Sequence, residues 1–588
     1  MIPACRLVRH AARRIVWFVV AAGVASPALA ASLPAVESDR FMVVSAQSLA
    51  AEAGADILRQ GGNAIDAAVA VAYAEAVTNP CCGNLGGGGF LTARLADGRS
   101  VFLNFRETAP AAATRTMYQA ADGSVPPGAS LYGWRAVAVP GSVLGLDTAL
   151  ARWGTLPRER VMARAIRLAR DGFVLTRADA DIIARAAPLL RRDRALATIF
   201  LRPDGHAPQP GDRLVQPALA ATLTAIAEHG AAAFYAGALP EAAEAAARAG
   251  NGVLTAADFA AYRVQESEPL ACPYRGYTIL SAPLPSSGGT AICELLGVLE
   301  GWNLHDMGFH AAASVRVMVE AMRHVYADRN TRLGDPAFVE DPVAMLLSPA
   351  HLAEIRARIA AGDQGPQVPA AAEKRETTHF SVVDAAGNAV AVTTTLNGAF
   401  GAGVVAPGTG VVMNDEMDDF TVAPGRPNLF GLVQGEANAI APGKRPLSSM
   451  APTIVLRDGR LVAVLGSPGG SRIITTVLET ILNLVDHDMA PQEAVDAPRL
   501  HFQGQPNQLF AEPRALSPDT RQRLEAMGYR ITINPPWGAV ALITVGQTRA
   551  QSGAAPAIPD SAASGGTRPG LLYGAMDPRR PAGAAIGQ

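Results

Sequence analysis

Two clusters of threonine stand in the middle of the chain, where they could do nucleophilic chemistry. Thr377 and Thr378 follow a charged stretch and begin a run of alternating residues, and Thr393–Thr395 end the next such run. A threonine hydroxyl is a weak nucleophile unless a base lies beside it. β-Branched residues also begin many ordinary strands. The residues alone therefore leave two interpretations open, a nucleophile or the start of a strand.

The base that such a threonine needs has two common sources. In α/β-hydrolases a histidine activates a serine in a GxSxG turn between a strand and a helix, and no such turn is found here. The alternative is the nucleophile's own α-amine, whose ordinary pKa is roughly 7.7–8.0. A mid-chain threonine has no free amine, so the chain would first have to be cut before Thr377. The polar, alanine-rich stretch 361–376 has the composition of the exposed linker that a self-processing precursor needs.

Hydrophobic periodicity predicts the elements that would position these threonines. Alternating residues predict a hairpin over 380–396, turning at 384–388, and a second hairpin over 451–467, turning at 458–459. Further patterns predict a helix over 46–62, a helix over 63–77 capped by Asn63, a hairpin over 83–107, alanine-rich helices over 157–259 and a strand–turn–helix unit over 277–301. The mixture of strands and helices places the chain in the α/β (α+β) class.

Length and composition limit the domain organisation and the partners of the protein. The chain has 588 residues, which predicts either two or more domains or one large layered domain. Charged residues make up 17% of the chain and the formal net charge is −2, so a nucleic-acid partner is not expected.

The first thirty residues have the features of a signal peptide. Four arginines between positions 6 and 14 precede the apolar run Ile15–Val24, and Ala28–Ala30 supplies a cleavage site of small residues. An uncleaved anchor is the alternative. We expect a mature protein that begins near Ala31, has no membrane-spanning segment and is periplasmic or secreted.

Four cysteines remain after the signal peptide, too few for a disulfide framework in a chain of this length. The sequence leaves open whether Cys272 and Cys293 pair. Adjacent Cys81 and Cys82 are not expected to bridge, because a bond between neighbours strains the backbone. No histidine spacing completes a metal site, so neither a metal nor a cofactor is expected.

Many long motifs in one order reveal a family resemblance. They are GGNAIDAAVAVAYAEAVTNP, GNLGGGGF, FRETAP, AVPGSVLGL, PLPSSGG, YADRNTRLGDPAFV, TTHFSVVDAAGNAVAVTTTLN, NDEMDDF, KRPLSSMAPTIV and GSPGGSRIITTVL. From about Val43 to Arg579, the chain resembles the γ-glutamyltranspeptidase (glutathione hydrolase) family of the N-terminal-nucleophile hydrolase superfamily.

The resemblance implies a fold and a maturation step. The fold would be a four-layer αββα sandwich built from two intertwined subunits of one precursor. Cleavage between Glu376 and Thr377 would give a large subunit, 31–376, and a small catalytic subunit, 377–588, which remain together as a heterodimer. Residues 548–569 are rich in Ala, Gly, Ser and Pro, and we predict a flexible insertion without an assigned role.

The resemblance also implies the catalytic residues. Thr377 would be the nucleophile, and Thr395 would hydrogen-bond to it. Gly469 and Gly470 follow a strand and precede a helix near Arg472, so their backbone N–H groups could stabilise an oxyanion. An ordinary turn or a phosphate nest is the alternative, although the lysine of a nucleotide-binding loop is missing. His379 is expected to be a buried structural residue, and Thr378 to support packing.

A γ-glutamyl substrate carries both a carboxylate and an ammonium at its α-carbon, and the resemblance supplies a residue for each. Arg106 would bind the carboxylate in a bidentate manner, with Ser448 and Ser449 as hydroxyl donors. Asp419 would bind the ammonium, helped by Glu416 and Asn397. Phe430 stands where bacterial relatives often carry a lid tyrosine, so it would keep the aromatic cover without the hydroxyl.

The function implied is transfer of the γ-glutamyl group of glutathione, or of related compounds, to water or to amino acids and peptides. An acylase of the same family, acting on a donor such as a glutaryl-cephalosporin, is one alternative. A non-catalytic exported binding protein is the other. The intact set of Arg106, Asp419, Ser448 and Ser449 argues against the first alternative. An intact Thr377, with Thr395 and the glycine pair, argues against the second.

Overall fold

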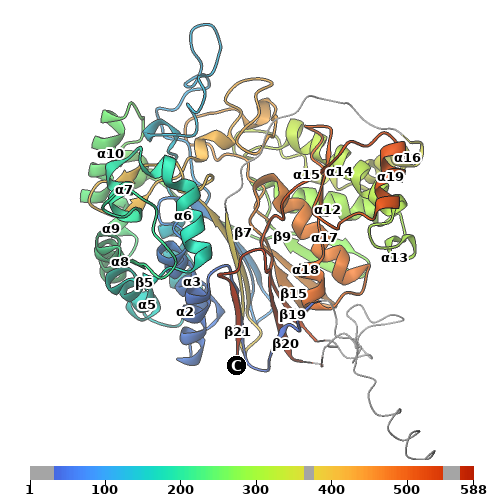
Figure 1. The fold of residues 1–588 in the computed structure, drawn as a ribbon, viewed down its shortest axis with the longest axis horizontal. Coiled ribbons are helices and arrows are strands. Elements are labelled where there is room, and N and C mark those ends of the chain that lie inside the picture. Colours follow the sequence, from blue (N-terminus) through green and yellow to red (C-terminus); the bar gives the residue numbers. More distant parts are fainter. Residues whose placement is uncertain (1–31, 363–376, 547–567, 569) are drawn as a thin grey trace, which may run out of the picture.

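Two antiparallel sheets stacked face to face form the centre of the molecule (Figure 1). The computed structural model describes residues 32–362, 377–546, 568 and 570–588. Helices cover both outer faces of the stacked sheets. The arrangement is the predicted α–β–β–α sandwich, formed as one large layered domain.

Each central sheet has seven strands, and all neighbours within it are antiparallel. The first sheet contains, in spatial order, β1 (Val36–Ser38), β20 (Leu572–Met576), β19 (Ala541–Val545), β15 (Arg460–Leu465), β14 (Thr453–Arg457), β9 (Tyr277–Ser281) and β8 (Leu270–Tyr274). The second contains β21 (Ala584–Gly587), β2 (Met42–Ser45), β10 (Thr378–Val383), β11 (Ala389–Thr395), β3 (Gly88–Arg94), β4 (Ser100–Asn104) and β7 (Gln265–Ser267).

The two sheets share an apolar core that draws on distant parts of the chain. Met42 and Val44 of β2 pack with Ile454 of β14, Val464 of β15 and Ile543 of β19 in one buried cluster. Small side chains of β10 and β11 complete this layer. Each central sheet is covered on both of its faces, so successive residues of a strand are all buried. This explains why these strands are mostly apolar.

One helical layer covers the sheet that contains β10 and β11, and its residues form one continuous buried cluster with that sheet. Its helices are α2 (Ser48–Arg59), α3 (Ala64–Thr78), α4 (Ser142–Trp153), α5 (Arg158–Asp171), α6 (Arg177–Leu190), α7 (Arg194–Phe200), α8 (Pro217–His229), α9 (Ala232–Tyr235), α10 (Ala238–Ala249) and α11 (Ala256–Ala261). The opposite layer consists of α12 (Ser287–Leu299), α13 (Leu304–Met307), α14 (Ala312–Arg332), α16 (Pro349–Ala360), α17 (Ile473–Val485), α18 (Pro491–Asp496) and α19 (Pro518–Ala526).

Short elements connect these layers. They are β5 (Phe173–Val174) with β6 (Arg213–Leu214), β12 (Val405–Ala406) with β13 (Val411–Val412), the three strands β16 (Leu500–His501), β17 (Leu509–Ala511) and β18 (Ile531–Ile533), helix α15 (Val343–Leu346), and the 3-10 turns η1 (Trp134–Ala136), η2 (Glu416–Asp419), η3 (Glu436–Asn438) and η4 (Gly470–Arg472). Two of these turns, η2 and η4, carry predicted site residues.

The predicted elements next to the threonines are confirmed. β10 and β11 form the first hairpin, in which Thr378 lies opposite Thr394, and the Asp384 carboxylate accepts N–H groups within the turn. β14 and β15 form the second hairpin, and β3 with β4 form the third. Asn63 caps α3 through its side-chain oxygen, as predicted.

The cysteines differ in part from expectation. Cys272 and Cys293 form a disulfide that joins β8 to α12, which settles the pairing that the sequence left open. The prediction that Cys81 and Cys82 do not bridge is wrong, because the structure joins them in a disulfide. They lie in the turn after α3, where the Asn79 carbonyl accepts two backbone N–H groups. That tight turn brings the neighbouring sulfurs together.

Several predictions fall on residues that the structure does not describe. The signal peptide, the linker over 363–376 with Glu376, and nearly all of the insertion over 548–569 lie outside the described residues. Within the described parts of the chain, no helix has the length and apolar composition needed to cross a membrane.

Candidate active site

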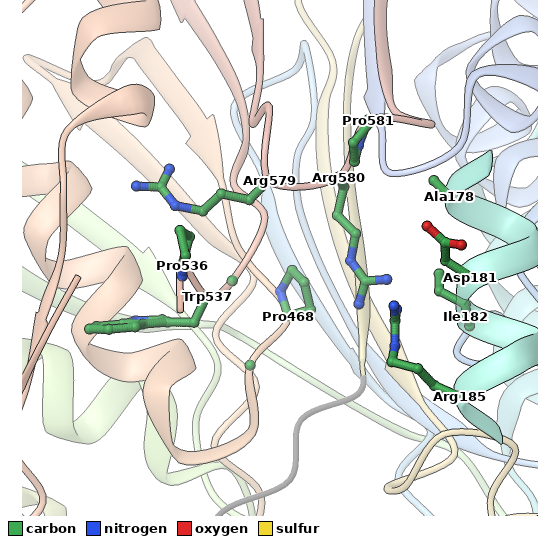
Figure 2. Close-up of a pocket in the computed structure, with 12 residues that line it drawn as sticks. Ala178, Asp181, Ile182, Arg185, Pro468, Pro536, Trp537, Arg579, Arg580 and Pro581 are labelled. Atoms are coloured by element: carbon green, nitrogen blue, oxygen red, sulfur yellow. The ribbon is translucent and has the colours of Figure 1, made fainter. Parts of the chain in front are cut away.

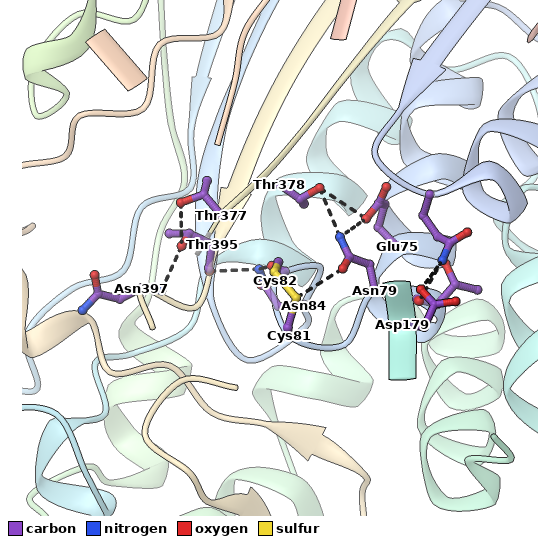
Figure 3. Close-up of a disulfide and its surroundings, with 12 residues drawn as sticks. Glu75, Asn79, Cys81, Cys82, Asn84, Asp179, Thr377, Thr378, Thr395 and Asn397 are labelled. Carbon is purple, nitrogen blue, oxygen red and sulfur yellow. Dashed lines mark hydrogen bonds between the residues drawn. A yellow bond between two sulfur atoms is a disulfide. The ribbon is translucent and has the colours of Figure 1, made fainter. Parts of the chain in front are cut away.

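The two predicted catalytic threonines meet at one end of the β10–β11 hairpin (Figure 3). Thr377 directly precedes β10, and Thr395 is the last residue of β11. The Thr377 hydroxyl donates to Thr395 Oγ1 over 3.4 Å, and Thr395 Oγ1 also accepts the Asn397 N–H over 2.9 Å. Both threonines are buried. The antiparallel pairing of the hairpin brings together hydroxyls that are 18 positions apart in sequence.

The turn after α3 supports both strands from the side (Figure 3). Asn84 donates to the Thr395 carbonyl over 2.9 Å and accepts the Ser142 hydroxyl over 2.6 Å. At the other strand, the Thr378 hydroxyl donates to Glu75 over 3.3 Å, and Asn79 donates to Glu75 over 2.7 Å. Thr378 therefore has the packing contacts that its predicted role requires.

Arg106 forms the centre of a buried group of charges. It follows β4, and η2 brings Glu416 and Asp419 to it from more than 300 positions away. Its guanidinium lies 2.7 Å from Glu416 Oε2, 2.5 Å from Asp419 Oδ2 and 3.6 Å from Glu107 Oε2. The predicted carboxylate-binding and ammonium-binding residues are thus ion-paired with one another.

When three carboxylates surround one guanidinium, their negative charges repel one another, and this repulsion opposes the ionisation of all three. Burial opposes the charge of Arg106, but Glu416, Asp419 and Glu107 outweigh it and raise the pKa of Arg106. Burial raises the pKa of Glu107 to about 7 and that of Glu416 well above its ordinary value. Glu107 and Glu416 therefore hold protons more tightly than exposed carboxylates would.

A small pocket opens at Thr377 and collects most of the predicted site. The predicted residues that line it are Thr377, Thr395, Gly470, Arg106, Asn397, Asp419, Ser448 and Ser449. Phe430 lines it as well. Glu416 does not, because its carboxylate is fully buried against Arg106. Gly469 lines the neighbouring cavity instead.

Asn397 presents an open acceptor in this pocket. Its backbone is in the left-handed region, at φ 76°, and its side-chain N–H donates to the Asp415 carbonyl over 3.0 Å. Its buried Oδ1 has no hydrogen-bond partner among the described residues. A buried carbonyl oxygen without a partner is costly unless a ligand satisfies it. The pocket therefore favours a ligand with an N–H donor at this point.

The glycine turn and the aromatic residue of the pocket pack directly on one another. Gly469 and Gly470 have φ values of 141° and 57°, which other residues adopt only with strain. A Cβ placed on Gly470 would lie 2.3 Å from the Phe430 ring. Phe430 therefore covers the turn closely, which agrees with the expected aromatic cover.

Sequence reasoning missed one charged residue of the pocket, Arg329, and the apolar lining residues Leu432, Leu447, Met450 and Ile473. Arg329 lies on α14, is buried, and donates to the hydroxyls of Ser287 and Ser449 over 3.0 and 3.1 Å. Its remaining hydrogen bonds go to the side-chain oxygens of Asn330 and Gln434. Burial lowers the pKa of Arg329 to about 10. Its motif, YADRNTRLGDPAFV, was visible in the sequence, but nothing local indicated which arginine faces the pocket.

His379 is buried, as predicted, and does not line the pocket. Its ring nitrogens lie 2.8 Å from the Thr393 hydroxyl and 3.2 Å from the Ser381 hydroxyl. Burial lowers the pKa of His379 to about 3, so the ring is neutral at physiological pH. Its hydrogen bonds stay within the hairpin, and its ring lies against Gly466, which follows β15 of the opposite sheet. These contacts suit a structural residue.

Among the described residues, Glu294, Asp328 and His351 could together hold a metal ion, since their ligand atoms lie within 4.8 Å of one another. They belong to α12, α14 and α16. His351 Nε2 lies 3.1 Å from Glu294 and 3.2 Å from Asp328, and Arg332 pairs with Asp328 over 2.8 Å. Because these cations already balance the carboxylates, the group is explained without an ion.

The Thr377 hydroxyl lies at the start of a central strand, and two antiparallel sheets are stacked on one another. This arrangement places the protein among the N-terminal-nucleophile hydrolases. The sequence model described as gamma-glutamyltranspeptidase matches residues 50–586. The chain therefore belongs to the γ-glutamyltranspeptidase family.

Individual relatives agree with this assignment. The chain is 49% identical to a glutathione hydrolase proenzyme of Pseudomonas sp. (strain A14), covering 95% of this chain and 96% of that protein. It is 43% identical to the glutathione hydrolase proenzyme of Escherichia coli (strain K12), covering 92% and 91% of the two chains. Among solved structures, a cephalosporin acylase from Bacillus halodurans superposes with a TM-score of 0.81 at 27% identity, over 96% of this chain and 99% of that one.

Proposed function

We propose that the protein is a γ-glutamyltransferase and glutathione hydrolase whose nucleophile is the Thr377 hydroxyl. The observation that carries this proposal is the convergence of Thr377, Arg106 and Asp419 on one pocket. A nucleophile beside a pair of opposite charges suits a donor with an α-carboxylate and an α-ammonium next to its reactive chain. The reaction requires no cofactor.

Maturation comes first, because Thr377 has no α-amine in the intact chain. In the proposed step, the Thr377 hydroxyl attacks the carbonyl carbon of Glu376, and the peptide C–N bond breaks to leave an ester. The same bond cleavage frees the α-amine of Thr377, which takes up the hydroxyl proton. Water then hydrolyses the ester, which restores the Thr377 hydroxyl and leaves a carboxylate at Glu376. The products are the large subunit 31–376 and the small subunit 377–588, which remain together because strands of both, such as β2 and β10, are neighbours in one sheet.

Acyl transfer then uses the same hydroxyl. The α-amine accepts the hydroxyl proton, Thr377 Oγ1 attacks the γ-carbonyl of the donor, and the amine passes the proton to the leaving nitrogen. The Thr395 hydroxyl, 3.4 Å from the nucleophile, holds it in place. The backbone at Gly470 stabilises the oxyanion. Water or an amine then attacks the γ-glutamyl ester and regenerates the hydroxyl.

Donor binding would exchange one ion pair for two. In the free protein Arg106 contacts Asp419 directly, over 2.5 Å. A zwitterionic donor places its carboxylate on Arg106 and its ammonium on Asp419, with the open Asn397 Oδ1 as a further acceptor for the ammonium. Ser448 and Ser449 line the pocket, and their hydroxyls would donate to the donor carboxylate. Each charge of the donor would meet an opposite charge, and this attraction would offset the desolvation cost of placing ions in a protein interior.

The protein is also proposed to act outside the cytoplasm, in a periplasm or as a secreted enzyme. The support is the N-terminal sequence, in which arginines, an apolar run and a small-residue cleavage site follow one another. N-terminal sequencing of the secreted large subunit tests this, with a start near Ala31 expected.

Two measurements test the proposed function. Intact-mass analysis of purified protein is expected to show two chains divided before Thr377. A chromogenic γ-glutamyl anilide is expected to release aniline slowly with water alone and faster with glycylglycine. A single full-length chain that releases no aniline would instead favour a binding protein without catalysis.

The close superposition on a cephalosporin acylase favours the acylase alternative, as does the 42% identity to an acylase ACY 1 proenzyme of Pseudomonas sp. (strain SE83) over 84% of this chain. The donors of such an acylase lack the α-ammonium group, so they would leave Asp419 and the open Asn397 Oδ1 without a ligand contact. Comparison of γ-glutamyl anilide with glutaryl anilide distinguishes the two functions. A protein that prefers the glutaryl donor would contradict the proposed one.

A further inference from the structure

A second hollow space is lined by one face of α6 and by residues near the C-terminus of the chain (Figure 2). This cavity has a volume of about 340 Å³, whereas the pocket at Thr377 measures about 20 Å³. Gly469 lines the larger space and the adjacent Gly470 lines the smaller one. The two spaces therefore meet at the glycine turn. Because the pocket at Thr377 is small, the rest of a donor, or an acceptor, has to lie outside it.

Helix α6 forms one wall of the larger space. Ala178, Asp181, Ile182 and Arg185 line it at the spacing of one helix face. Ile182 and Arg185 also line another cavity of about 400 Å³, together with Gly398 and Leu429. These last two residues are sequence neighbours of Asn397 and Phe430 in the nucleophile pocket. Arg185 thus stands where two cavities that flank the nucleophile adjoin.

The charges of the 340 Å³ cavity favour an anion. The side chains of Arg185 and Arg580 point toward one another across it (Figure 2). Arg185 has no ion pair or hydrogen bond within the described part of the chain, and its side chain is exposed. Asp181, one turn earlier on α6, is the carboxylate of this lining. Two facing guanidinium groups repel one another unless an anion lies between them.

The third arginine of the lining, Arg579, adds no available positive charge to the cavity. Arg579 pairs with Glu512 over 2.5 Å and with Asp577 over 3.1 Å, so its charge is already compensated. Burial raises the pKa of the Glu75 carboxyl group, and the positive charge of Arg580 partly opposes that rise. Arg185 is therefore the cation of the lining whose charge is most available to a ligand.

We propose that this cavity binds the carboxylate of the acceptor, and of the leaving group, and that Arg185 selects acceptors with a free carboxylate. The ligand class is an amino acid or short peptide. Its amine nitrogen attacks the γ-glutamyl ester carbon while its carboxylate contacts Arg185. The new C–N bond forms, the C–Oγ bond to Thr377 breaks, and the amine proton returns to Oγ through the α-amine. This inference rests on the proposed function.

The test compares two acceptors that differ in one charge. Glycylglycine and its C-terminal amide are each titrated against γ-glutamyl anilide, with the mature wild-type enzyme and the variant Arg185→Gln. The KM for glycylglycine is expected to rise about ten-fold to a hundred-fold in the variant, as for loss of one charge-assisted contact. The KM for the amide, and hydrolysis without acceptor, are expected to stay unchanged. Arg185→Lys is expected to recover part of the preference for glycylglycine.

Arg177→Gln provides the matched control. Arg177 is an exposed arginine in the first turn of the same helix and does not line the cavity, so both acceptors are expected to keep their wild-type KM. Unchanged hydrolysis without acceptor shows that a variant has folded and matured. An unchanged KM for glycylglycine in Arg185→Gln, or an equal rise for both acceptors, overturns the inference. Wild-type enzyme that releases no aniline overturns the proposed function itself.

Discussion

Replacement of Arg106 by glutamine tests the site most directly, because this side chain has two tasks in the structure. Its guanidinium holds Glu416 and Asp419 at 2.7 and 2.5 Å in a buried setting, and it lines the pocket at Thr377. The variant Arg106→Gln removes the cation that would bind the donor carboxylate. It also leaves buried carboxylates without their partner.

The magnitude follows from these contacts. Truncation of one partner of a buried charged pair costs about 2–5 kcal/mol in binding. At about 1.4 kcal/mol per decade, kcat/KM for γ-glutamyl anilide is expected to fall about thirty-fold to a few thousand-fold. Breaking a buried ion pair also destabilises a fold by about 3–5 kcal/mol. The free energy of unfolding is therefore expected to fall as well.

A compensating variant separates the two tasks. Arg106→Gln combined with Glu416→Gln removes a cation and a neighbouring carboxylate together, and Glu416 does not line the pocket. This double variant is expected to regain stability in chemical denaturation while kcat/KM stays low. Self-cleavage is expected in every variant that folds, because maturation does not use the donor carboxylate. Recovery of both stability and kcat/KM in the double variant would show that Arg106 only balances charge, and the reasoning would be refuted.

Three further predictions concern other parts of the molecule. Thr377→Ala is expected to abolish both cleavage and activity, and a mutant still cut before residue 377 by intact mass would contradict the assignment of the nucleophile. Phe430→Ala is expected to raise hydrolysis several-fold relative to transfer at fixed glycylglycine, because the ring covers Gly470; an unchanged product ratio would show that it does not exclude water. Burial raises the pKa of Glu294 to about 7, and the Glu294 contact raises the pKa of His351, so the folded state binds protons more tightly than the unfolded state. Stability is therefore expected to decline by up to about 3 kcal/mol as pH rises from about 4.5 through 7, and Glu294→Gln is expected to flatten this decline in denaturant titrations at pH 5 and 8.

Local sequence patterns determined much of the fold. Short strand-like runs separated by turn residues are enough to predict the β10–β11 and β14–β15 hairpins, in which nearly every residue is buried. A capping side chain such as Asn63 marks a helix start for a similarly local reason. The motifs around Thr377 and Gly470 likewise indicate a nucleophile and a turn. All of these features depend on residues within a few positions of one another.

The tertiary structure alone decided which distant groups meet. Arg106 and Asp419 are 313 positions apart, and only the stacked sheets and the η2 turn bring them into an ion pair. Arg329 faces the pocket because α14 packs against α12, α16 and α19, and periodicity cannot assign a helix to particular partners. The Cys81–Cys82 disulfide required a turn whose hydrogen bonds the sequence does not display. Sequence thus determined the elements and the reactive residues, whereas charge pairing and pocket shape arose from long-range packing, since those energies depend on distances that the chain order does not contain.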